Sequence, residues 1–373
     1  MSASAALARE HIPDSKHIYN HDIMTCTAEG VVGNHLYSGR ALGITEPWDM
    51  IQLHEELKPF WDDIAAHYNR IGLKHTKDVL WYLNFKEIGA HIGYTPSVFF
   101  YGPEENQYWG DQEWLYTVEY INSKNNFMNL AKELGIDVPT TICFSAAGNI
   151  DQDELSEVVY PCYLKAAISV SGVGIYRCKN RNELIENIKK FSPDTPVQIQ
   201  EEVIAESFLN MQYKVVGGEL IRLEASEQIL DGFVHQGNKV PASYTPWTQI
   251  EPMAEWLVTH GMKGIFAFDV AVCKTPQGVR FPAIECNPRF NGASYPTLIA
   301  QKLNISEWSA QTFNTKHRSL SDIELGDIEY DKNTGEGAII VNWGTISVGR
   351  LVILLAGSDE YQKALAIELE HRL

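Results

Sequence analysis

The chain has 373 residues, of which 45% are hydrophobic and 11% aromatic, so it is long enough for two or three packed structural units. Its formal charge of −18 argues against nucleic acid or an anionic membrane as a partner, because either needs a basic face. The six cysteines are spread singly without zinc spacing, and no apolar run is typical of a signal peptide or membrane span, which favours a cytoplasmic protein with reduced thiols.

Residues 1 to 120 are the least informative part of the chain. Their glycines lack the G-x-G-x-x-G order of a dinucleotide fingerprint. Apolar residues from Trp48 to Tyr68 recur at helical spacing that Pro59 interrupts, which predicts one broken helix or two. Residues 95 to 101 predict a strand. Residues 102 to 114 predict a loop, which can hang over a site or only cover the core.

A clearer pattern begins at Ile121. It predicts a helix from about Asn125 to Leu134, ended by Gly135, and then a strand over residues 140 to 144. Lys124 comes directly before the helix, where it can point at a phosphate, although a surface lysine is the simpler interpretation when the residue is taken alone.

The next strand, over residues 162 to 166, carries Lys165 in an apolar sequence. A lysine in the middle of a strand beside a glycine loop is unusual unless it faces a phosphate. The loop contains Ser171, Gly172 and Gly174, whose backbone N–H groups can approach phosphate oxygens closely, although a hairpin turn explains the glycines equally well. A strand over 175 to 178 and an amphipathic helix follow.

Residues 197 to 200 predict a strand that runs into an acidic corner, Glu201-Glu202, followed by Val203 and Ile204. Such a corner can offer backbone groups to the edge of an adenine and apolar side chains to its faces. Two solvated acids at a strand end explain the same residues.

Two antiparallel strands are predicted over residues 208 to 227, around Gly217 and Gly218. Residues 229 to 247 are rich in glycine and proline and predict a loop, in which His235 can contact a substrate. A helix over 250 to 262 then leads to a buried strand that carries one acid, Asp269.

The most informative stretch is residues 281 to 296, FPAIECNPRFNGASYP. A short strand here places Glu285 and Asn287 on one face, because side chains two apart in a strand point the same way. Carboxylate and amide oxygens are the hard ligands that Mg²⁺ prefers. Asp269 needs a partner or a metal because it lies in an apolar run, and Arg289 can bind a carboxylate or a phosphate.

The remainder of the chain predicts an amphipathic helix over residues 297 to 313. From about residue 320 it predicts a short cap, with strands at 338 to 342 and 351 to 355 and a closing helix.

These residues together resemble the ATP-grasp superfamily. Asp269, Glu285 and Asn287 resemble its metal-binding trio, and the run from Glu285 to Arg289 resembles the E-x-N-P-R motif of its carboxylate–amine ligases. Lys124 before a helix that ends in Leu-Gly-Ile, and Lys165 before a glycine loop, are similar to the family's phosphate-binding lysines and lid. The resemblance covers roughly residues 121 to 305.

The resemblance implies a mixed α+β and α/β architecture, in which two α+β lobes grip ATP behind an N-terminal α/β domain. The implied units are an N-terminal domain over 1–120, a small lobe over 121–205, a large lobe over 206–320 and a C-terminal cap over 321–373.

The resemblance also implies the ligands and their contacts. Asp269, Glu285 and Asn287 are expected to hold two Mg²⁺ ions, for which Mn²⁺ can substitute. The residues expected to bind ATP, with Glu206 on the ribose, are Lys124, Lys165, Ser171, Gly172, Gly174, Glu201, Glu202, Val203, Ile204 and Glu206.

The implied reaction joins a carboxylate to an amine through an acyl phosphate and releases ADP and phosphate, with Arg289 and Lys165 as catalytic residues. Amino acids or small peptides are the expected substrates, and a homodimer is the default assembly. Two alternatives stay open: an enzyme like biotin carboxylase that forms carboxyphosphate, and an ATP-binding module without catalysis. Neither H-R-D nor D-F-G occurs, which argues against a protein kinase.

Overall fold

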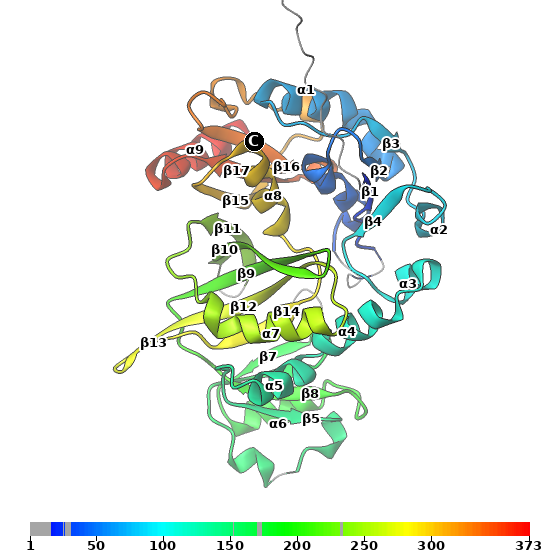
Figure 1. Cartoon of the computed structure of the whole chain (residues 1–373). Helices are drawn as coiled ribbons and strands as arrows, with labels where there is room; N and C mark the ends of the chain where they lie inside the picture. Colours follow the sequence, from blue (N-terminus) through cyan, green and yellow to red (C-terminus); the bar gives the residue numbers. More distant parts are fainter. Residues whose placement is uncertain (1–15, 25, 27–30, 152, 170–173, 232–233) are drawn as a thin grey trace, which may run out of the picture.

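A computed structural model describes residues 16–24, 26, 31–151, 153–169, 174–231 and 234–373. Ser171 and Gly172 of the predicted glycine lid lie outside these residues. Within the described chain, three sheets follow one another, and Figure 1 shows them in blue to cyan, in green, and in green to orange.

The N-terminal sheet is parallel throughout, with the strand order β3-β2-β1-β4. The chain therefore adds strands on one side of β1 and then crosses to the other side for β4. The strands are β1 (Lys16–Asn20), β2 (Met50–Gln52), β3 (Asp78–Leu80) and β4 (Tyr94–Val98). The helices around them are η1 (Asn34–Ile44), η2 (Glu55–Phe60), α1 (Trp61–Ile71), α2 (Phe85–Ile88), α3 (Pro103–Trp109) and α4 (Gln112–Asn122).

Two sequence predictions are wrong in this region. The start of the predicted helix over 48 to 68 is the strand β2, whose three residues are all buried and whose pattern is too short to distinguish from a helix. The predicted loop over 102 to 114 is mostly the helices α3 and α4. Their start signals are present in the sequence, since Glu105 accepts from the Gly102 N–H at 2.9 Å and Asp111 accepts from the Trp114 N–H at 3.1 Å.

The small sheet is antiparallel, with the order β5-β8-β6-β7. Its strands are β5 (Thr141–Phe144), β6 (Cys162–Ala166), β7 (Ile175–Cys178) and β8 (Val197–Glu201), with the helices η3 (Ala147–Asn149), η4 (Glu154–Ser156), α5 (Lys124–Glu133) and α6 (Arg181–Ile188). The strands and helices predicted here are confirmed to within a few residues. Gly135 has a φ of 67°, as expected of the glycine that ends a helix.

The large sheet has the order β13-β12-β9-β10-β11-β15-β17-β16, with β14 paired to β12. Its strands are β9 (Ser207–Val216), β10 (Glu219–Asp231), β11 (Val234–Val240), β12 (Gly264–Thr275), β13 (Gly278–Arg280), β14 (Ala283–Asn287), β15 (Trp308–Asn314), β16 (Gly337–Asn342) and β17 (Arg350–Ala356). The helices of this part are α7 (Trp247–Thr259), α8 (Ser294–Leu303), η5 (Leu320–Asp322), η6 (Gly326–Ile328), η7 (Gly344–Val348) and α9 (Asp359–Arg372).

Two further predictions are corrected in the large sheet. The stretch 229 to 247 is not a loop throughout, because most of it completes β10 and forms β11. Gly237 belongs to a strand rather than a turn: a Cβ there would lie 2.0 Å from the carbonyl oxygen of Ala310 on β15. The predicted helix over 297 to 313 ends at Leu303, where Asn304 adopts a left-handed φ of 57°, and β15 follows.

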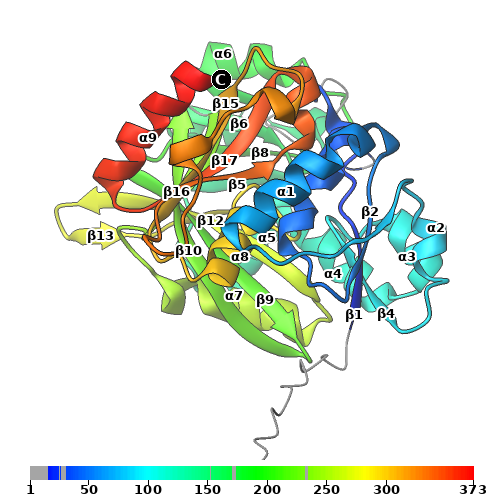
Figure 2. The same cartoon turned by 90° about the horizontal axis from the view of Figure 1, so that it is seen from above.

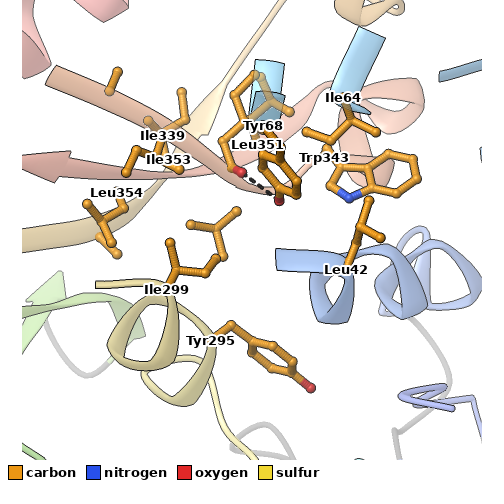
Figure 3. Packing of buried hydrophobic residues seen from close by; sticks show 14 of the residues in the cluster. Leu42, Ile64, Tyr68, Tyr295, Ile299, Ile339, Trp343, Leu351, Ile353 and Leu354 are labelled. Carbon is orange, nitrogen blue, oxygen red and sulfur yellow. Dashed lines mark hydrogen bonds between the residues drawn. The ribbon is translucent and has the colours of Figure 1, made fainter. Parts of the chain in front are cut away.

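The largest apolar core joins the two ends of the chain. Leu42 and Tyr68 pack with Trp343 and Ile353, as Figure 3 shows, and the Tyr68 hydroxyl donates to the buried Ile340 carbonyl at 3.0 Å. Figure 2 shows α9 on one side of the molecule and the β1 to β4 sheet on the other. Strands β15 to β17 therefore extend the large sheet and pack on the N-terminal part as well.

A second core orients the helix that carries Lys124. Phe127 of α5 and Val118 of α4 are buried together with Phe268 of β12 and Met211 of β9. This packing places the first turn of α5 against the large sheet. In the described part of the chain, no helix combines the length and the apolar run that a membrane span requires.

Candidate active site

Three polar side chains meet on one face of the large sheet. Asp269 of β12 lies directly opposite Glu285 of β14, and Ala267 lies opposite Asn287, in an antiparallel pair. Residues that are directly opposite share a face. The Asn287 Nδ2 donates to Asp269 Oδ2 at 3.0 Å, so the amide and the two acids form one cluster.

Two neighbouring strands hold the other oxygen of Asp269. Its Oδ1 accepts from Asn210 Nδ2 on β9 and from Gln228 Nε2 on β10, both at 2.8 Å. Burial and the charge of Glu285 together raise the pKa of Asp269 to about 7. The Asp269 side chain therefore keeps its proton to a higher pH than usual, unless a cation is nearby.

Lys124 connects the first turn of α5 to this cluster. Its Nζ lies 2.9 Å from Glu285 Oε2, and its backbone N–H donates to the Ala167 carbonyl just after β6 at 2.7 Å. Burial acts to raise the pKa of Glu285, but Lys124, followed by Lys165 and Arg289, lowers it below its usual value. The small sheet thus supplies positive charge to the acids of the large sheet.

Lys165 is buried on β6, with 8% of its surface exposed, and its Nζ donates to Gln200 Oε1 on β8 at 2.7 Å. Burial lowers its pKa to about 8, while Glu285 acts to raise it and Lys124 to lower it. Gln198 lies opposite Lys165 on β8 and is fully buried, and neither the nitrogen nor the oxygen of its amide has a hydrogen-bond partner within the described part of the chain. The face of the small sheet that carries Lys165 therefore lies toward Asp269 and Glu285, and some of its buried polar atoms lack a hydrogen-bond partner among the described residues.

Arg289 follows Asn287 by two residues, and its N–H donates to the Asn287 carbonyl at 2.8 Å. Its side chain is half-buried. Among the described residues its guanidinium has no ion-pair or hydrogen-bond partner, which leaves it available to an anion.

The predicted adenine corner lies at the end of β8, and its acids all have protein partners. The Glu201 carboxylate accepts from the Thr140 N–H at 2.9 Å. Arg177 forms two bonds to the Glu202 carboxylate, at 2.6 and 2.7 Å, and Glu206 pairs with Lys274 at 2.7 Å. Ile204 is 92% exposed, so the structure shows an apolar side chain at this corner that is covered by nothing in the described chain.

The remaining predicted residues are placed as follows. Gly174 has a φ of 76°, and its carbonyl accepts from the Ala166 N–H at 3.0 Å, next to Lys165. The His235 Nε2 bonds Asn238 Oδ1 at 2.7 Å. Its ring lies 3.2 Å from the position of a Cβ on Gly292, so it is close to the segment after Arg289.

Sequence reasoning missed Asn210, Gln228 and Gln198. Each lies in a strand that carries other polar residues as well, so the sequence gives no clear signal that points to them. Their role depends on cross-strand neighbours, which a single sequence does not reveal.

No model of a known protein family and no curated protein sequence matches this chain. Several solved structures are nevertheless similar to this chain. An N5-carboxyaminoimidazole ribonucleotide synthetase in complex with ADP superposes with a TM-score of 0.63 and 14% identity, over 98% of each chain. The Staphylococcus aureus N5-carboxyaminoimidazole synthetase with ADP superposes with a TM-score of 0.63 and 11% identity, over 96% of this chain and 98% of that chain. An L-amino acid ligase from Bacillus licheniformis gives 0.55 and 11%, over 97% and 98%.

The chain has the ATP-grasp fold. The predicted fold class is thereby confirmed, including the N-terminal domain in front of the two lobes. In this fold the small sheet with Lys165 and the large sheet with Asp269 and Glu285 are the two lobes, and the ion pair of Lys124 with Glu285 joins them.

Proposed function

We propose that this chain is an ATP-dependent carboxylate–amine ligase, which forms an amide bond and releases ADP and phosphate. One observation supports it above all: Asp269 and Glu285 face each other on adjacent strands beside Asn287. Lys124 of the other lobe pairs with the same cluster.

We further propose that Asp269, Glu285 and Asn287 bind Mg²⁺, as two ions, with Mn²⁺ able to substitute. The residues fit this role, because two close carboxylates and an amide offer only hard oxygen ligands. Burial, followed by the charge of Glu285, raises the pKa of Asp269, and a divalent cation beside the two carboxylates would favour the ionised form. When bound, Mg²⁺ would neutralise part of the negative charge of the triphosphate.

The nucleotide is proposed to lie between the lobes. Lys124 and Lys165 would contact its phosphates, together with Ser171, Gly172 and Gly174 of the lid. The adenine would meet the corner of Glu201, Glu202, Val203 and Ile204, with Glu206 on the ribose. Among the described residues the N–H groups of Val203 and Ile204 have no protein acceptor, so both can donate to an adenine.

The chemistry then follows from charge and position. A carboxylate oxygen of the acid attacks the γ-phosphorus, the bond to the bridging oxygen breaks, and ADP leaves with the electron pair. The amine nitrogen attacks the carbonyl of the acyl phosphate and loses a proton, and phosphate departs. Arg289 would hold the attacking carboxylate and then the oxyanion, a role in which one lost donor costs roughly 10²–10³ in rate.

The test is ADP release from Mg·ATP with pools of amino acids as acids and amines. A ligase releases ADP only when both are present and yields a product with the mass of acid plus amine minus water. A nucleotide-induced rise in melting temperature without turnover would instead indicate a binding module.

A second candidate is an enzyme that uses bicarbonate as its carboxylate and forms carboxyphosphate. This candidate is suggested by the synthetases among the similar solved structures, whose names describe an N-carboxylated product. Bicarbonate-dependent ADP release without an organic acid would establish it.

A further inference from the structure

One arginine outside the proposed nucleotide site has no anionic partner among the described residues. Arg40 of η1 is 8% exposed and lies among three aromatic rings. Its guanidinium carbon is 4.4 Å from the ring centre of Tyr295, 4.6 Å from that of Phe99 and 5.1 Å from that of Tyr37. Aromatic faces stabilise a cation but accept no conventional hydrogen bonds.

Two nitrogens of Arg40, Nε and Nη2, are buried and have no hydrogen-bond partner among the residues that the structure describes. A guanidinium does not lose its charge in a protein, so it cannot become neutral to avoid burial. Asp22 and Glu105, which act on the Cys26 thiol together with Arg40, each accept a backbone N–H: Asp22 Oδ1 from Met24 at 3.0 Å and Glu105 Oε2 from Gly102 at 2.9 Å. No ion pair of Arg40 is found among the described residues.

The unpaired atoms form one edge of the guanidinium. The Nε–H and one Nη2–H point in the same direction and match the two oxygens of a carboxylate, which they bind with two parallel hydrogen bonds. The free edge thus has the shape of a carboxylate site.

The site lies next to the segment that carries Arg289. Phe99 follows β4, and its carbonyl accepts from the N–H of Phe290 at 3.1 Å. His21 follows β1, lies 4.5 Å from the Phe290 ring and bonds the Tyr295 hydroxyl at 2.8 Å. These residues meet where the order of the parallel sheet reverses, at the carboxyl ends of β1 and β4, and such switch points bind ligands in open α/β sheets.

The two arginines also act on one thiol. Burial raises the pKa of Cys26 to about 11, while Arg289 and Arg40 both act to lower it. Both guanidinium groups are therefore close enough to Cys26 to act on the charge of its thiol.

We propose that Arg40 binds a carboxylate of the amine substrate that takes no part in the reaction, so that this substrate is an amino acid or peptide with a free carboxylate. The inference rests on the proposed ligase function. The reacting carboxylate must lie at the γ-phosphate beside Arg289, so a carboxylate on Arg40 is a second one.

The experiment compares an amino acid that the wild-type protein accepts as amine with the carboxamide of the same amino acid. In Arg40→Met the KM for the amino acid rises by about 10²-fold, since a buried charge partner is lost. The KM for ATP stays unchanged. With the wild-type protein the KM for the carboxamide is already higher than that for the amino acid, and the Arg40→Met substitution raises it little further. Arg40→Lys keeps the charge but loses the two parallel N–H donors. Its KM for the amino acid is therefore expected to lie between those of wild type and Arg40→Met.

Several results would overturn the inference. Equal losses for the amino acid and its carboxamide would mean that Arg40 only supports the fold, and a loss that is largest for a phosphate-bearing amine would identify the anion as phosphate. If Arg40→Met does not fold, the same comparison in wild type and Arg40→Lys decides, because equal KM values for the two amines in wild type contradict the proposal.

Calorimetric binding of the amino acid and its carboxamide separates this inference from the ligase proposal, because it needs no turnover. A wild-type protein that releases no ADP with any acid and amine refutes the ligase function. Tighter binding of the amino acid that Arg40→Met abolishes would still support the carboxylate site, and equal binding would refute it.

Discussion

Lys165 is a buried charge on the face of the small sheet where we propose that the phosphates bind. It is buried on β6 and bonded to the neutral oxygen of Gln200, with Lys124 and Glu285 close enough to influence it. Its pKa of about 8 lies near physiological pH, because burial disfavours the ammonium form. A phosphate beside it would restore the preference for the charged form.

This arrangement predicts a pH dependence of nucleotide binding. Because the ammonium form of Lys165 is lost as pH rises through about 8, the affinity for ADP in wild type falls above that pH, by about tenfold at most per pH unit. In Lys165→Arg the cation persists and the affinity stays level to pH 9.5. Calorimetric titrations from pH 6.5 to 9.5 measure both, and parallel curves for the two proteins would contradict the role of Lys165.

At the residue scale, the sequence carries the identities of the acid cluster and little of its support. Asp269, Glu285 and Asn287 stand out because polar residues are rare in strands of this kind. Asn210, Gln228 and Arg40 do not stand out, since their significance comes from partners, or from missing partners, that only the folded chain brings together.

At the scale of elements, the join between β11 and β15 connects the large lobe to the C-terminal strands. Gly237 pairs with Gln311 across this join, and the backbone of β15 approaches it so closely that no side chain fits. The strand order therefore depends on a glycine that resembles a turn residue in the sequence.

The substitution Gly237→Ala is expected to lower the free energy of unfolding by about 3 kcal/mol, because the new methyl group would overlap the Ala310 carbonyl. Denaturant unfolding measures the loss. Gly89→Ala is the matched control: Gly89 has a φ of −65°, its Cβ would lie 3.5 Å from the Trp109 side chain, and we expect a change within about 0.5 kcal/mol. Equal effects would show that β11 does not pack as described.

Helices and strands that combine a periodic apolar pattern with a proline or glycine at one end could be predicted from the sequence. Elements that are too short to show a period, or that contain a glycine typical of loops, could not. Strands β6 and β7 and helix α5 match their predictions because proline or glycine marks their ends. Strand β2 has three residues, too few for a period, and β11 contains the glycine that favoured a loop.

At the scale of the whole molecule, Glu329 ties the C-terminal segment to the N-terminal helix α1. It receives two bonds from Arg70, both at 2.8 Å, and one from His67 Nδ1 at 2.7 Å. His67 Nε2 accepts from the Ile340 N–H at 3.1 Å, so His67 is neutral and carries its proton on Nδ1. The sequence offers no sign of this contact, because the partners lie far apart along the chain.

This contact predicts how stability depends on acid. Burial acts to raise the pKa of Glu329, but His67 and Arg70 lower it to about 2, so its stabilisation is present above pH 4.5 and is lost as pH falls toward 2. The pKa of Glu329 therefore lies about 2.5 below the usual 4.5, which corresponds to a contribution of about 3 kcal/mol to the free energy of unfolding. We reduce this to about 2 kcal/mol because Arg70 is 58% exposed.

Glu329→Gln should therefore unfold about 2 kcal/mol more easily than wild type at pH 7, and the gap should narrow as pH falls from 4.5 to 3. Urea unfolding at a series of pH values measures it. Glu368→Gln, which breaks a surface pair with Arg372, should change stability by less than about 1 kcal/mol. A constant gap at all pH values would contradict the assigned role of Glu329.

We propose that the two facing strands of the large lobe, β12 and β14, present a metal site to a nucleotide. The most direct test of this proposal is the affinity for a non-hydrolysable ATP analogue, measured by calorimetry with Mg²⁺ and with EDTA, in wild type, Glu285→Gln and the control Glu251→Gln of α7. We expect Mg²⁺ to strengthen binding in wild type and in the control, and Glu285→Gln to lose roughly 10- to 100-fold in affinity with Mg²⁺ and little with EDTA. Wild-type affinity that does not respond to Mg²⁺, or an unchanged affinity in Glu285→Gln, would contradict the proposal.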